Sequence, residues 1–202
     1  MQTPVLENPC SLKMLKKIAA YEKRVFSSDA IPLSRMIELW KKNPFMFTAL
    51  RSGNKFLGYF DIFVPNEPGE KVLRERNGID QKLSAEHMRD PQSMRGTKMI
   101  YFDAIGAVGS GESRKRIAAM LMYGRATFVQ RRFRLPSTIY VIPTTPEGKK
   151  LVKSYGGARF AKASISHTVY WMFKLRATAS WCKKVKARAA KRAVPKIAFA
   201  RV

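Results

Sequence analysis

The chain has 202 residues, of which 46% are hydrophobic, so we expect one packed domain and exclude wholesale disorder. No apolar run approaches the roughly 20 residues that a membrane span needs, and the start of the sequence lacks a secretory signal pattern, so we expect a cytoplasmic protein. The only two cysteines, Cys10 and Cys182, exclude a disulfide framework and a cysteine-based zinc site.

Positive charge is the strongest compositional feature. Lysine and arginine number 39 against 14 acidic residues, which gives a net charge of +25, and Glu147 is the last acidic residue. A field of this size attracts anions such as nucleic acid, anionic lipid or an acidic ligand. The alternative, a set of basic side chains that are simply solvated, stays open at this point.

The first half of the chain reads as two helices, a hairpin and an insertion. Apolar residues recur at helical spacing from Leu12 to Val25, and Ser11 suits the N-cap of that helix. Proline, glycine and asparagine punctuate the segment after the hairpin, and loops of such length often carry function. We predict helices at 11–26 and 33–42, strands at 45–51 and 55–64, and an insertion at 65–98 with short helical pieces near 68–76 and 84–90.

The second half alternates strands with helices, which predicts a parallel strand pair joined by a helical crossover. Together with the antiparallel hairpin, this order predicts an α/β fold with a central mixed sheet flanked by helices. We predict strands at 98–108, 138–142, 158–163 and 166–174, and helices at 113–132 and from Pro146 to Gly156-Gly157. We divide the chain into a domain at 1–175 and a basic tail at 176–202.

The tail has the composition of a basic amphipathic helix. Trp181, Val185 and Ala189 share one face of a helix at 176–192, which Pro195 ends, and lysine and arginine surround the other faces. Three interpretations stay open. The helix binds the phosphates of nucleic acid, lies on an anionic membrane surface, or packs back onto the domain.

A glycine-rich turn stands between the strand at 98–108 and the long helix. It runs Gly109-Ser110-Gly111-Glu112-Ser113, and three cations, Arg114, Lys115 and Arg116, follow at the helix start. The first amide groups of a helix lack internal partners and attract an anion, which would also relieve the repulsion between these cations and the helix dipole. A solvated helix start, partly neutralised by Glu112, is the alternative.

The element order and the segment from Ala107 to Leu121 resemble the GNAT superfamily of acyl-CoA-dependent N-acyltransferases. In that family this strand splays from its neighbour. The turn and helix start bind the coenzyme A pyrophosphate through the motif Arg or Gln, two variable residues, Gly, one variable residue, then Gly or Ala. The best placement puts Ser113 first, Arg116 in the middle and Ala118 last, so only Ala118 matches. Arg116 either binds phosphate through its side chain or marks the loss of the coenzyme.

The resemblance implies acetyl-CoA, or another acyl-CoA, as the cofactor and an amine as the acceptor. A basic surface suits an acceptor that is acidic or linked to nucleic acid. A non-catalytic module of the same fold that binds nucleic acid or membrane is the alternative function. The fold also implies a strand before the first helix, for which residues 3–6 are a poor candidate. The implied cofactor-binding residues are Ala107, Val108, Gly109, Gly111, Ser113, Arg114, Lys115, Arg116, Ile117 and Ala118.

Two catalytic roles follow from the resemblance. The candidates for the general base are Asp103, where burial within a strand would raise the pKa, and Glu112. A structural Asp103 paired with an arginine is the alternative. Tyr155, immediately before Gly156, is the candidate for the general acid, although the family's tyrosine usually lies about a turn earlier.

Neither histidine has a partner at metal-ligand spacing, so we expect no metal site. We interpret His167, which lies in a predicted strand, as structural.

Overall fold

The computed structural model describes residues 2–27, 30–165, 168–192 and 198–199, and for Asp80 and Gln81 it describes the backbone only. The sequence predicts a structural role for His167 and a helix end at Pro195, and both residues lie outside the described ones. The helices are α1 (Leu12–Phe26), α2 (Leu33–Lys42), α3 (Glu67–Glu75), α4 (Ile79–Lys82), α5 (Gly111–Arg132), α6 (Pro146–Ser154) and α7 (Ala179–Ala190). Short 3-10 turns lie at Pro44–Met46, Ala85–His87 and Met94–Gly96.

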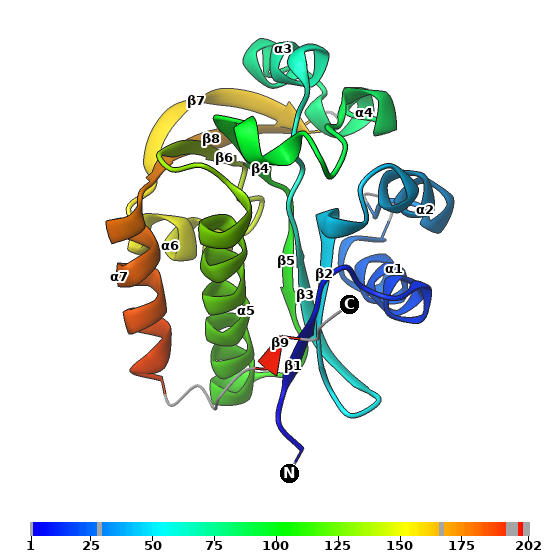
Figure 1. Cartoon of the computed structure of the whole chain (residues 1–202), viewed down its shortest axis with the longest axis vertical. Helices are drawn as coiled ribbons and strands as arrows, with labels where there is room; N and C mark the ends of the chain where they lie inside the picture. Colours follow the sequence, from blue (N-terminus) through cyan, green and yellow to red (C-terminus); the bar gives the residue numbers. More distant parts are fainter. Residues whose placement is uncertain (1, 28–29, 166–167, 193–197, 200–202) are drawn as a thin grey trace.

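The strands form two adjoining sheets. One has the order β5-β3-β2-β1-β9, and the other has the order β4-β6-β8-β7. Helices α1 and α2 lie on one side of the first sheet and α5 lies on the other (Figure 1). The fold is therefore α/β with mixed strand directions, as the sequence predicts. The strands are β1 (Val5–Glu7), β2 (Phe47–Ser52), β3 (Lys55–Asp61), β4 (Met99–Phe102), β5 (Ile105–Ala107), β6 (Ser137–Val141), β7 (Ala158–Ile165), β8 (Thr168–Ala177) and β9 (Ala198–Phe199).

A strand does precede α1, and the sequence-based doubt about residues 3–6 was wrong. β1 pairs antiparallel with β2, where Leu6 lies opposite Leu50, and both side chains are fully buried. With three residues β1 is too short to show the alternation that identifies a strand in a sequence. Ser11 then caps α1, because its hydroxyl accepts the N–H of Met14 at 3.4 Å.

The insertion forms a helical cap beside the second sheet. The predicted piece near 68–76 is the helix Glu67–Glu75, which begins and ends one residue earlier. Asn66 caps it by accepting the N–H of Gly69 at 3.0 Å. The predicted piece near 84–90 is only a 3-10 turn at Ala85–His87. Buried Leu73, Ile79 and Met88 join the insertion to the core shared with α1 and α2.

The single strand predicted at 98–108 is broken in two. β4 pairs parallel with β6, whereas β5 pairs antiparallel with β3. At the break, the N–H of Ala104 donates to the Asp61 carboxylate and its carbonyl accepts from the Arg125 guanidinium. The backbone at Ala104 therefore bonds to these two side chains, and the chain changes partner strands.

The basic tail helix packs onto the domain. α7 lies beside α5 (Figure 1), and Cys182, Val185 and Ala189 on its apolar face are buried. Val185 contributes to a small core with Met122 and Ala126 of α5. Of the three interpretations of this helix, the structure agrees with packing onto the domain, because the apolar face of α7 is buried against α5. No helix in the described part of the chain is long and apolar enough to span a membrane.

Candidate active site

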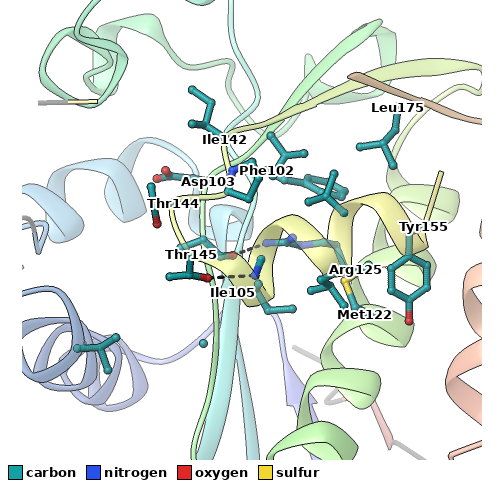
Figure 2. A pocket seen from close by; sticks show the side chains of 18 of the residues that line it. Phe102, Asp103, Ile105, Met122, Arg125, Ile142, Thr144, Thr145, Tyr155 and Leu175 are labelled. Atoms are coloured by element: carbon teal, nitrogen blue, oxygen red, sulfur yellow. Dashed lines mark hydrogen bonds between the residues drawn. The ribbon is translucent and has the colours of Figure 1, made fainter. Parts of the chain in front are cut away.

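The two sheets separate beyond Asp103 and open a cleft. β4 and β6 stay paired as far as Phe102 opposite Val141, after which β5 follows β3 and the chain beyond β6 turns into α6. A cavity of about 160 Å³ lies where they part, lined by residues of α1, α5, α6, α7 and of strands from both sheets. Figure 2 shows Asp103 and Tyr155 toward opposite ends of this cleft, with Arg125 between them.

A second cavity, of about 540 Å³, lies on the side of α1 and α2. Glu22, Arg35 and Tyr170 are among its lining residues. The two cavities have part of their walls in common, and Asp103 and Thr144 belong to that shared wall. A group at Asp103 can therefore meet a ligand in either cavity.

A buried polar cluster fixes the backbone beside Asp103. Arg125 is 3% exposed, donates to the backbone carbonyl of Asp61 at 3.1 Å, and stands 4.2 Å from the centroid of the Phe102 ring. Burial lowers the pKa of Arg125 to about 10, so it stays charged at neutral pH. Burial, followed by the charges of Asp103 and Glu22, raises the pKa of Asp61 well above its usual value.

Glu22 is a site residue that the sequence analysis missed. It lies on α1, is 3% exposed, and accepts a hydrogen bond from the Tyr59 hydroxyl at 2.7 Å. Burial raises the pKa of Glu22 to about 7, and the charge of Asp103 adds to this rise while the Tyr59 hydrogen bond opposes it. Its position, one helical turn after buried Ile18, was the available signal, because an acid on an apolar helix face needs an explanation.

The start of α5 is open. The helix begins at Gly111, two residues before the predicted start, and the Ser110 side chain makes no capping hydrogen bond. Glu112 is exposed and pairs with Lys115 at 2.6 Å, and the Lys115 ammonium lowers the pKa of Glu112. Glu112 lines neither cavity, so the structure does not bring this candidate base to Asp103.

The cofactor-binding residues inferred from the sequence take different places. Of the three cations at the helix start, only Arg114 lines the cleft, whereas Lys115 and Arg116 are exposed outside it. Ala107 is buried in β5, where its carbonyl accepts the Tyr21 hydroxyl at 3.2 Å. The others follow the path from strand to helix: Val108 is half-buried, Gly109, Gly111 and Ser113 are exposed, Ile117 is buried and Ala118 is half-buried.

Tyr155 lines the cleft at the C-terminal end of α6. Its backbone carbonyl accepts the indole N–H of Trp181 at 2.9 Å, which ties α6 to α7. The Arg188 guanidinium stands 5.6 Å from the centroid of its ring. Burial raises the pKa of Tyr155, so the phenol keeps its proton at neutral pH. Figure 2 shows its hydroxyl directed away from Asp103.

No protein-family model and no curated protein sequence matches this chain. Solved structures do match it. The loading GNATL domain of CurA from Lyngbya majuscula has a TM-score of 0.61 at 9% identity, over 86% of this chain and 98% of that one. Ard1 from Thermoplasma volcanium has a TM-score of 0.59 at 9% identity, over 87% and 99%.

A putative acetyltransferase from Salmonella typhimurium, solved with its cofactor acetyl-CoA, has a TM-score of 0.55 at 8% identity, over 88% of this chain and 96% of that one. Structural likeness at such low sequence identity shows the fold alone. The separation of β5 from β4 and β6 beside α5 agrees with that fold. From its strand order, its cleft and these likenesses, the chain has the fold of the GNAT superfamily.

Proposed function

We propose that the protein is an N-acyltransferase that moves an acyl group, most simply acetyl, from acyl-CoA to an amine in the cytoplasm. The observation that carries this proposal is the meeting of two cavities at Asp103. A transfer between two substrates needs both reacting groups at one point, and holding them there lowers the barrier. The two free cysteines, Cys10 and Cys182, are buried, which suits a reducing compartment.

The cleft side fits an acyl-CoA. The N–H groups of Gly111, Glu112 and Ser113 open α5 with no side-chain cap, and Arg114 adds positive charge on the cleft wall. These groups would hold the pyrophosphate. β5 pairs with β3 along one edge only, so its other edge is available to amide groups of a pantetheine arm. Arg116 replaces the usual glycine but is exposed at the helix surface, so it leaves the cleft open.

The larger cavity fits an amine. In a chain of net charge +25, its wall carries two carboxyl groups, those of Glu22 and Asp103, and one guanidinium, that of Arg35. Two carboxyl groups in a partly buried cavity favour a cationic ammonium group over an anion. The acceptor is therefore an amine, and the basic exterior would attract a larger acidic molecule that carries it.

When bound, acyl-CoA supplies a thioester whose carbonyl carbon is open to attack by an amine nitrogen. The ammonium form must first lose a proton, and Asp103 at the shared wall receives it directly or through water. Tyr155 keeps a proton that it can give to the departing thiolate. Since its hydroxyl points away from Asp103, this role requires the sulfur to leave on the α6 side of the cleft.

Calorimetric titration with acetyl-CoA tests the proposal. We expect micromolar binding to the wild-type protein and weakening by Arg114→Glu. The matched control is Lys13→Glu, which makes the same charge change at an exposed position of α1. Absence of binding at millimolar acetyl-CoA would sink the enzymatic proposal.

A non-catalytic module of the same fold is the second candidate function. Arg116 in place of the motif glycine favours it. This candidate predicts no affinity for acetyl-CoA, together with salt-sensitive retention on immobilised nucleic acid or on anionic vesicles. The titration therefore separates the two functions.

A further inference from the structure

A third cavity, of about 200 Å³, lies between α3 and the second sheet. None of its lining residues belongs to either cavity of the candidate active site. In Figure 1, α3 stands beyond β7 and β8, at the far end of the sheet from the start of α5. We call this cavity the α3 pocket. Its lining residues are Leu73, Arg74, Arg76, Met99, Tyr140 and Phe160.

An exposed aromatic ring forms one wall of the α3 pocket. Phe160 is 50% exposed, although a ring of this size is usually buried. A bulge in the pairing of β7 with β8 leaves Phe160 without a partner between Arg159 and Ala161. Tyr140 supports the ring, with centroids 5.6 Å apart and planes at 60°. The bulge therefore turns a rigid, supported ring toward the pocket.

Positive charge surrounds this ring. The Lys174 ammonium stands 5.3 Å from its centroid, and the exposed Arg74 and Arg76 line the pocket. Of these cations, Arg74 has an acidic partner, because Glu70 accepts a hydrogen bond from it at 3.0 Å. This exposed ion pair holds Arg74 in place without removing the excess of positive charge. The pocket thus combines an aromatic face with two lining cations, Arg74 and Arg76, and a third cation, Lys174, beside the ring.

We propose that the α3 pocket binds an unpaired nucleotide of a single-stranded nucleic acid. The base stacks on the exposed part of Phe160, and Arg74, Arg76 and Lys174 contact the adjoining phosphates. Stacking on an aromatic side chain within a positively charged groove is the recurring way in which proteins hold unpaired bases. A membrane surface fits less well, because the ring lines a concavity between charged side chains and does not project from the surface.

Fluorescence anisotropy with a labelled single-stranded RNA of about 12 nucleotides tests this site. We expect Phe160→Leu to weaken binding by about 5- to 100-fold, the range for loss of one stacked base. Phe160→Tyr keeps a ring and should retain affinity near the wild-type value. Arg76→Glu should weaken binding and reduce its dependence on salt concentration. Thermal unfolding of each variant verifies that the fold is intact.

Trp171→Leu is the matched control. Trp171 is 37% exposed in the same hairpin, and the Arg159 guanidinium stands 5.1 Å from its centroid. It follows Tyr170 and precedes Met172, which both pack into the core on the α3 side, so its side chain lies on the opposite face. Equal losses with Trp171→Leu and Phe160→Leu would overturn the proposal, as would the absence of RNA binding at micromolar protein and low salt.

Two further measurements complete the test. Vesicles containing anionic lipid should not compete with the RNA, and a loss of vesicle binding in Phe160→Leu with RNA binding unchanged would overturn the assignment. The affinity of Phe160→Leu for acetyl-CoA should equal that of the wild type, because Phe160 lines neither active-site cavity. Failure at the α3 pocket can therefore be told apart from failure of the proposed acyl transfer.

Discussion

The two cavities that meet at Asp103 are built in opposite ways. The start of α5, on the cleft side, is exposed, uncapped by its own side chains and rich in cations. On the α1 side, Glu22 is almost fully buried and is held by the hydroxyl of Tyr59. The first region carries several cations, whereas the wall of the second carries the carboxyl groups of Glu22 and Asp103 beside one guanidinium, that of Arg35. Under the proposed acyl transfer, this difference would favour the anionic donor on the cleft side of Asp103.

This difference also shows how a protein of net charge +25 uses its few acids. Asp61 and Glu22 are buried beside the site, where burial raises the pKa of both. Elsewhere acids such as Glu112 and Asp90 are exposed in ion pairs with lysine, which lower their pKa. Exposed pairs of this kind contribute little to stability, whereas buried carboxyl groups respond strongly to a change of pH or of partner.

The largest expected effect is the loss of activity on substitution of Asp103, where the two cavities meet. Asp103→Asn removes the proposed proton acceptor but keeps the shape of the shared wall, so we expect kcat to fall by about 10²- to 10⁴-fold. Affinity for acetyl-CoA, measured by calorimetry, should stay near the wild-type value. If acetyl-CoA affinity falls as far as kcat does, Asp103 acts in binding on the cleft side and the comparison fails.

The second prediction concerns the cation between the two sides. Arg125→Met leaves the buried carboxyl of Asp61 without its nearby positive charge and frees the carbonyl of Ala104. We expect the free energy of unfolding to fall by about 3–5 kcal/mol in urea denaturation. Arg132→Met is the control, because Arg132 is exposed on the same helix and stacks on Phe45. An equal fall in the free energy of unfolding in both variants would contradict the prediction that Arg125 stabilises the fold through its buried contacts.

The third prediction uses pH to examine the acidic side. Burial raises the pKa of Glu22 from its ordinary value of 4.5 to about 7 in the folded protein, so the folded state binds more protons between these values. The contribution of Glu22 to stability is therefore present at low pH and lost as pH rises to about 7, by about 3 kcal/mol.

Glu22→Gln should flatten this part of the pH dependence, measured by urea denaturation at about pH 5 and about pH 8. Glu38→Gln, at an exposed position of α2, is the control. A wild-type protein that loses no stability between these two pH values would contradict the prediction.

The smallest expected effect separates two cations at the start of α5. Arg114 lines the cleft and Arg116 does not, so Arg114→Glu should weaken acetyl-CoA binding by about tenfold and Arg116→Glu by less. Calorimetry at two salt concentrations measures both. A larger loss with Arg116→Glu would mean that its side chain, which replaces the motif glycine, takes over the binding of phosphate.

The sequence was sufficient for the order of helices and strands, because periodicity and turn residues are local properties. It was not sufficient for the break at Ala104. That break depends on Asp61, which is 43 residues away, and on Arg125, which is 21 residues away. An apolar run interrupted only by Asp103 gives no clear sign that a strand will change partners.

The site was predicted unevenly for the same reason. Asp103, Tyr155 and Arg114 were named from their positions along the fold, and all three line the cleft. Glu112 was also named, but it pairs with the nearby Lys115 and does not reach the cleft. The direction in which the start of α5 faces determines this, and the sequence does not show that direction. Glu22 was missed because its burial comes from packing against Tyr59, which is 37 residues away in the chain.

The wall shared by the two cavities also bears on the kinetic scheme. Under the proposed acyl transfer, donor and acceptor would occupy the two cavities that meet at Asp103 at the same time, so the acyl group would need no temporary covalent attachment to a side chain. Cys10 and Cys182, the nucleophiles best suited to carry it, line neither cavity. Double-reciprocal plots at several fixed acceptor concentrations should accordingly intersect and not run parallel.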